Sequence, residues 1–106
     1  MTPWEVIRER VRAAAEADFV VSLYNPRSKD RDWQLGEARE ILLEHRSPVT
    51  PVGVVRDAYR EGQKVILTDL TSLHPESVDM LTVVIIGNSR TKIRAGRMVT
   101  PRGYEV

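Results

Sequence analysis

Residues 19–24 have the sequence Phe-Val-Val-Ser-Leu-Tyr, a run of apolar and β-branched side chains interrupted by one serine. A run of six such residues between polar segments is typical of a buried β-strand. Its nearly continuous apolarity predicts a parallel strand that is covered on both faces. Asn25 and Pro26 follow directly, and because the residue before a proline is disfavoured in helical space, we expect a loop over residues 25–32.

Two amphipathic helices flank this strand in the sequence. The first is predicted to begin in the capping-box pattern of residues 2–5 and to end near Ala17 or Asp18. The second begins at Asp32 or Trp33 and ends within residues 45–48. Each helix has one apolar stripe for the core, formed by Ile7, Val11 and Ala14 in the first and by Leu35, Ala38, Ile41 and Leu42 in the second.

The rest of the chain is rich in strand patterns. Residues 51–55 and 64–68 are predicted to form a hairpin, and residues 81–86 a fourth strand. Residues 69–79 look irregular, and a short terminal hairpin is expected over residues 92–100.

This order of elements mixes crossovers with hairpins. It predicts an α/β fold with a mixed, mostly parallel central sheet of about five strands flanked by helices. In such folds the ligand crevice lies outside the carboxyl ends of parallel strands. That rule points to the loops after Tyr24, Val55 and Ile86.

Composition limits the classes of function. The chain has 106 residues with 42% hydrophobic and 29% charged side chains, which is ordinary for one globular domain. The net charge of +1 gives no general attraction to nucleic acid or to an anionic membrane. The absence of cysteine excludes disulfides and thiolate metal sites, and residues 81–86 are too short an apolar stretch to span a bilayer. We therefore expect a soluble cytoplasmic protein with no nucleic-acid or membrane partner.

Three cations, Arg27, Lys29 and Arg31, lie in the loop that follows the first strand. Their side chains could bind carboxylates or phosphates, although a solvated loop whose charges largely cancel explains the same residues equally well. Arg56, beyond the second strand, could line the same crevice or form an ordinary surface ion pair.

No complete catalytic centre is visible in the sequence. His45 and His74 each lack a second ligand at metal-binding spacing, so no metal site is predicted. Residues 87–89, Gly-Asn-Ser, lack the glycine spacing of a phosphate-binding loop. No nucleophile-elbow spacing and no motif with paired carboxylates occurs, so the catalytic residues stay unassigned.

Several strings recur in one order along nearly the whole chain and resemble the precorrin-3B C(17)-methyltransferases of the tetrapyrrole methylase superfamily. They are TPWE (2–5), DFVVSLYNPRSKDR (18–31), TPVGVV (50–55), REG (60–62), VDMLTVVIIGNS (78–89) and GRMVTPRGY (96–104). The resemblance implies that residues 1–106 are the C-terminal domain of a two-domain enzyme of cobalamin biosynthesis. This enzyme would use S-adenosylmethionine to methylate a polycarboxylate tetrapyrrole at ring carbon 17 and to contract the macrocycle.

The resemblance also implies partners. The superfamily's N-terminal domain carries a Gly-x-Gly-x-Gly-Asp loop and most of the catalytic groups, and no such string occurs here. The isolated chain is therefore expected to be inactive without that domain. A homodimer is also implied, whereas the choice between a metal-free and a cobalt-containing substrate is left open.

Site residues can be carried over from the family position by position. The cofactor-binding positions correspond to Tyr24 with Asn25 after the first strand, to Ala58 after the second, and more loosely to Leu81 and Thr82. Arg27, Lys29, Arg31 and Arg56 become candidates for binding the acidic side arms of the tetrapyrrole. The chain departs from the family pattern at Asp57, Tyr59 and Arg90, and the added carboxylate of Asp57 beside Ala58 puts cofactor affinity in question.

Two other functions are consistent with the sequence. The chain could be a catalytically inactive, stand-alone binding or dimerisation module with the same fold. It could also be a small nucleic-acid binder that uses the loop from Arg27 to Arg31, but the near-neutral net charge counts against this reading.

Overall fold

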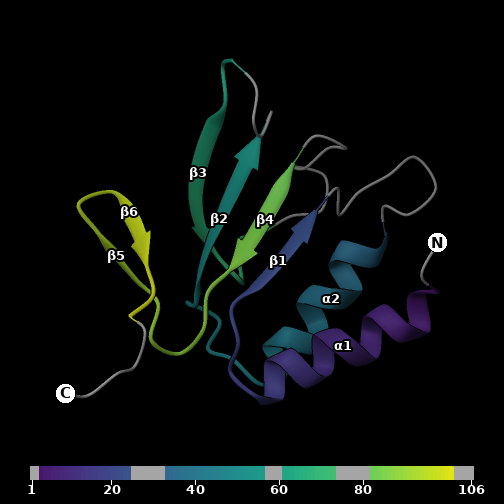
Figure 1. Cartoon of the computed structure of the whole chain (residues 1–106). Helices are drawn as coiled ribbons and strands as arrows, with labels where there is room; N and C mark the ends of the chain where they lie inside the picture. The colour runs from purple at the N-terminus through teal and green to yellow at the C-terminus, as the bar shows by residue number, and fades with distance from the viewer. Residues whose placement is uncertain (1–2, 25–32, 57–60, 74–81, 102–106) are drawn as a thin grey trace.

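The computed structural model describes residues 3–24, 33–56, 61–73 and 82–101, and Figure 1 shows their arrangement. The elements in chain order are α1 (Trp4–Glu16), β1 (Val21–Tyr24), α2 (Trp33–Leu43), β2 (Pro51–Arg56), β3 (Lys64–Asp69), β4 (Val83–Ile86), β5 (Lys92–Arg94) and β6 (Arg97–Val99). Within these residues no helix is both long and apolar enough to cross a bilayer.

The prediction of a mostly parallel sheet of about five strands is wrong. The described strands form a four-stranded sheet in the order β1-β4-β2-β3 and a separate two-stranded hairpin, β5-β6. Every pairing in both sheets is antiparallel. β1 and β2 do run in the same direction, as the helical crossover between them requires, but β4 returns between them in the opposite direction (Figure 1).

The apolar run of residues 19–24 was misleading because it is not one continuous buried strand. Phe19 and Val20 precede β1 and are 64% and 40% exposed, and the strand itself begins at Val21. Within β1, Val21 is buried while Tyr24 is 65% exposed. The strand is thus covered on one face only, as is usual in antiparallel sheets.

The two helices cover one face of the sheet and build the core there. All four predicted stripe residues of α2 are buried, together with Val11 and Ala15 of α1. They pack in one cluster against alternate residues of three strands, namely Val21, Val52, Val54, Val84 and Ile86. The stripe predicted for α2 is therefore confirmed, whereas in α1 Val11 is buried and Ile7 and Ala14 are partly buried against the core. Leu70 and Leu73, in the segment predicted to be irregular, are also fully inside this core.

The opposite face of the sheet, which we call the open face, carries the alternate strand residues. The β5-β6 hairpin folds over part of it, since Met98 lies 3.6 Å from where a Cβ on Gly53 would be. Ala95 and Gly96, the two residues of its turn, both have positive φ angles, as a tight two-residue hairpin requires. The predicted hairpins over β2-β3 and β5-β6 are both confirmed.

Candidate functional site

The carboxyl ends of β1 and β2 and the start of β4 meet at one edge of the sheet, which we call the Tyr24 edge (Figure 1). Tyr24 pairs with Val83, and Val83 pairs on its other side with Val55. Directly opposed residues of antiparallel strands point to the same face. The exposed phenol ring of Tyr24 therefore begins an apolar row that crosses the open face.

Three predicted site residues lie at this edge, but in different settings. Tyr24 is 65% exposed, whereas Thr82, immediately before β4, is fully buried. Arg56 is exposed at the end of β2, and the strand alternation places it on the helix-covered side, opposite to Tyr24. The structure thus brings the three residues to one edge without placing their side chains on one face.

The other predicted site residues lie outside the described part of the chain. They are Asn25, Arg27, Lys29, Arg31, Ala58 and Leu81. The loop after Ile86, also predicted to line the crevice, lies at the opposite edge of the sheet. The reason is again the direction of β4, which places its start, not its end, at the Tyr24 edge.

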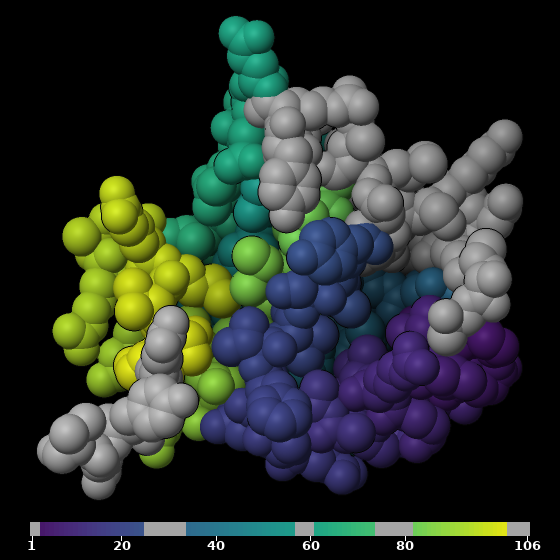
Figure 2. All heavy atoms as spheres, viewed as in Figure 1, coloured from purple at the N-terminus to yellow at the C-terminus, as the bar shows by residue number. Residues whose placement is uncertain are grey.

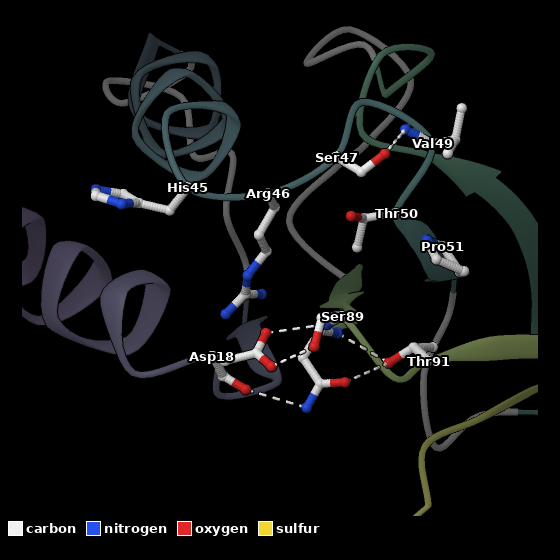
Figure 3. Close-up of a pocket in the computed structure, with 10 residues that line it drawn as sticks. Asp18, His45, Arg46, Ser47, Val49, Thr50, Pro51, Ser89 and Thr91 are labelled. Atoms are coloured by element: carbon white, nitrogen blue, oxygen red, sulfur yellow. Dashed lines mark hydrogen bonds between the residues drawn. The ribbon is translucent and has the colours of Figure 1, made fainter.

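The opposite edge contains a polar cavity of about 340 Å³, drawn in Figure 3. It is lined by residues that follow the carboxyl ends of α1, α2 and β4. Asp18, with a φ of 60°, is bound there by the segment that follows β4. The Ser89 amide donates to one carboxylate oxygen of Asp18 at 2.9 Å, and the Ser89 hydroxyl donates to the other. These two hydrogen bonds hold the pKa of Asp18 below its ordinary value, and the bond from the Ser89 hydroxyl has the larger effect.

Arg46 is the central cation of this edge and is only 8% exposed. Its guanidinium donates to the carbonyl of Gly87 at 2.7 Å, to that of Ala14 at 3.2 Å and to that of Phe19. It therefore joins the end of α1, the entry to β1 and the exit of β4. Burial lowers the pKa of Arg46, but an arginine keeps its charge throughout the physiological range.

In the sequence, Arg46 stands out only as one of residues 45–48, where the second helix was predicted to end. In the structure one of its carbonyl partners, Ala14, lies in the last turn of the other helix. No local pattern could reveal this, because the partners are distant in sequence. Residues 87–89 likewise belong to this polar network.

The described residues include no group of three or more histidine, aspartate and glutamate side chains placed to hold a metal ion. The polar groups around Asp18 largely satisfy one another, so this edge is suited to holding segments together. The exposed ring and apolar row at the Tyr24 edge are better suited to a ligand.

Known proteins match the chain along almost its whole length. A "Cobalt-factor III methyltransferase" of Priestia megaterium is 50% identical over 105 residues, or 99% of this chain. A "Probable cobalt-factor III C(17)-methyltransferase" of Salmonella typhimurium is 48% identical over 98% of it. The chain is therefore homologous to cobalt-factor III C(17)-methyltransferases. It spans 19% of the Priestia protein and 43% of the Salmonella protein.

Two solved methyltransferase structures also resemble the chain. The crystal structure of the methyltransferase CobJ superposes with a TM-score of 0.87 at 36% identity, over 94% of this chain and 42% of that one. A cobalt precorrin-4 methyltransferase has a TM-score of 0.59 at 16% identity, which is a likeness of fold alone. No protein-family model matches the chain.

Proposed function

We propose that this chain is the C-terminal half of an S-adenosylmethionine-dependent methyltransferase of cobalamin biosynthesis. The complete enzyme would methylate a precorrin-3B-type tetrapyrrole, metal-free or with cobalt, at ring carbon 17 with ring contraction. The observation that carries the proposal is the 48% identity to the Salmonella typhimurium protein, of which the chain spans less than half. The remainder of such an enzyme would supply the groups that this chain lacks.

In this proposal the Tyr24 edge completes the cofactor pocket. S-adenosylmethionine combines an aromatic base with polar groups, and the exposed ring of Tyr24 beside Val83 fits the apolar part of such a molecule. The methyl group would come from the sulfonium of the cofactor. The chain's contribution would be to bind and orient, with Asn25, Ala58, Leu81 and Thr82 as further predicted contacts.

We extend the proposal to a homodimer in the cytoplasm. The support for the dimer is the resemblance to the superfamily, and the support for the compartment is a chain without any cysteine. Arg27, Lys29, Arg31 and Arg56 stay predicted contacts of the substrate's carboxylates.

Joining the chain to the preceding segment of the Salmonella typhimurium relative tests the proposal. Calorimetry with S-adenosylmethionine should detect binding to the joined protein and little binding to the chain alone. The joined protein should also transfer a methyl group to cobalt-factor III. If the joined protein folds but binds no cofactor, the proposal is wrong and the stand-alone module is favoured.

Two exposed aromatic residues offer a matched pair of variants in the joined protein. Tyr24 is 65% exposed at the proposed cofactor edge, and Phe19 is 64% exposed at the opposite edge. Tyr24→Ala should weaken cofactor binding about tenfold, which is about 1.4 kcal/mol. Phe19→Ala should leave it unchanged, and equal effects would contradict the placement of the site.

A further inference from the structure

The β5-β6 hairpin concentrates positive charge. Residues 90–101 contain four arginines and lysines and no aspartate or glutamate. Within the hairpin, Arg94 pairs directly with Arg97, and Lys92, two residues away on the same face, is also exposed. Like charges in directly opposed positions destabilise a strand pair. Repulsion between these cations therefore destabilises the hairpin.

These charges are not neutralised by the rest of the described chain. The ion pairs among the described residues involve Arg8, Arg12 and Arg39, all on the two helices. Lys92, Arg94 and Arg97 form no ion pair with a described carboxylate. An external anion would therefore relieve the repulsion within the hairpin.

An apolar cavity of about 380 Å³ lies between this hairpin and the open face of the sheet. Gly53, Val55, Leu67 and Ile85 line it from the sheet, and Arg97 is among the hairpin residues that line it. Figure 2 shows the hairpin as a yellow lobe beside the teal and green atoms of the sheet. Apolar surface and one arginine are thus combined at this cavity, and Arg94 lies directly opposite that arginine in the hairpin.

The cavity is continuous with the Tyr24 edge. Val55, which lines the cavity, pairs with Val83, and Val83 pairs with Tyr24. Val65 pairs with Val55 on the other side and is 59% exposed. A flat apolar molecule in the cavity could therefore extend along this row toward the proposed cofactor site.

We propose that this cavity, with the cationic hairpin, binds the polycarboxylate substrate of the enzyme. The apolar ring would lie on Val55, Leu67 and Ile85, and Lys92, Arg94 and Arg97 would bind its carboxylate arms. Charge complementarity selects this occupant, because a purely apolar partner would leave the repelling cations unpaired. The inference rests on the proposed function for the identity of the substrate, but binding can be measured without turnover.

The test is a titration of the whole 106-residue chain with uroporphyrin, a stable porphyrin that carries two carboxylates on every pyrrole ring, followed by porphyrin fluorescence. The double variant Arg94→Gln/Arg97→Gln should raise Kd about tenfold at low salt, as expected for two exposed ion pairs. The control Arg10→Gln/Arg12→Gln removes the same charge from α1, on the helix-covered side, and should change Kd less than twofold. Equal losses in the two double variants would overturn the proposal.

A second pair of variants tests the apolar part of the site. Val65→Glu places a carboxylate beside the cavity and should repel uroporphyrin, whereas Val49→Glu, at a residue 71% exposed at the opposite edge, should not. Citrate, which has carboxylates but no ring, should not compete. Competition by citrate or a single-stranded oligonucleotide at equal charge concentration would show a general anion site and overturn the proposal.

The two proposals fail in different ways. If the joined protein binds S-adenosylmethionine but the chain and the joined protein ignore uroporphyrin, the substrate cavity is wrong and the proposed function stands. If uroporphyrin binds as expected and the joined protein binds no cofactor, the proposed function is wrong and the cavity is a tetrapyrrole site of another kind.

Discussion

Asp18 and Ser89 are 71 residues apart in sequence, yet both carboxylate oxygens of Asp18 accept hydrogen bonds from Ser89. The Asn88 side chain adds a third contact by donating to the Asp18 carbonyl at 3.0 Å. The turn after α1 and the turn after β4 are therefore held to each other at the edge of the sheet that is remote from Tyr24.

The Asp18 carboxylate should make stability depend on pH. Because Ser89 lowers its pKa in the folded state, its stabilisation is fully present above the unfolded value of about 3.9. It is lost as the pH falls through the lowered folded value. Urea denaturation should show Asp18→Asn less stable than the parent by about 1 kcal/mol at pH 7, with the difference shrinking at about pH 3. A difference independent of pH would contradict this account.

Asp18→Ala should be more harmful than Asp18→Asn. The residue has a φ of 60°, a region that asparagine adopts more readily than alanine. Alanine also removes both hydrogen bonds to Ser89. Thermal unfolding of the two variants should therefore give the lower Tm for alanine.

Replacing Arg46 by methionine should destabilise the fold by about 2–4 kcal/mol. The substitution keeps an elongated apolar stem but leaves three carbonyl groups, those of Ala14, Phe19 and Gly87, without this donor. Arg46→Lys should be intermediate, because an ammonium cannot reproduce the planar fork. Chemical denaturation measures both, with Arg39→Met as a control at an arginine that also donates to carbonyls but is more exposed.

Two buried glycines should respond differently to alanine. A Cβ on Gly87 would lie 2.6 Å from the Cβ of Thr91, whereas one on Gly53 would make only ordinary contacts, with the sulfur of Met98 at 3.6 Å and a methyl group of Leu67 at 3.9 Å. Gly87→Ala should therefore destabilise the protein by about 1–3 kcal/mol, and Gly53→Ala by clearly less. Comparable losses of Tm would show that the turn after β4 can relax.

The hairpin should show a trade between stability and binding. Arg94→Glu replaces a repelling pair with an attractive one opposite Arg97, which should stabilise the hairpin by about 0.2–1 kcal/mol. The same change should weaken uroporphyrin binding more than Arg94→Gln does. Hydrogen exchange of the hairpin amides measures the first effect and fluorescence titration the second. A variant that is more stable and binds equally well would contradict the proposed role of the charge.

The local elements could largely be predicted from the sequence, because their signals are local. The spacing of Leu35, Ala38, Ile41 and Leu42 fixes the buried side of α2 without knowledge of its partner. The hairpin turn at Ala95-Gly96 is likewise decided by adjacent residues. The strand order could not be predicted, because the apolar run of residues 19–24 indicated a strand buried on both faces, whereas β1 begins only at Val21 and is covered on one face.

Only those residues of the candidate site that lie at the carboxyl ends of strands could be predicted from the sequence. Tyr24 and Arg56 end strands of the same direction, so both were expected at one edge, and both are there. Their side chains point to opposite faces of the sheet, and this depends on how β1 and β2 pair with β4, which a single sequence does not reveal. The role of Arg46 depends on carbonyl groups up to 41 residues away, for which the sequence has no pattern.

The position of β4 has a consequence for how the chain folds. β2 and β3 are joined locally and can pair early, but β1 reaches the sheet only through β4, in contacts such as Val21 with Ile86. Such distant pairings are slow to form because a long loop must first close. During synthesis β1 would therefore lack a strand partner until β4 has emerged. The completion of β4 should be the step at which the domain becomes resistant to proteases.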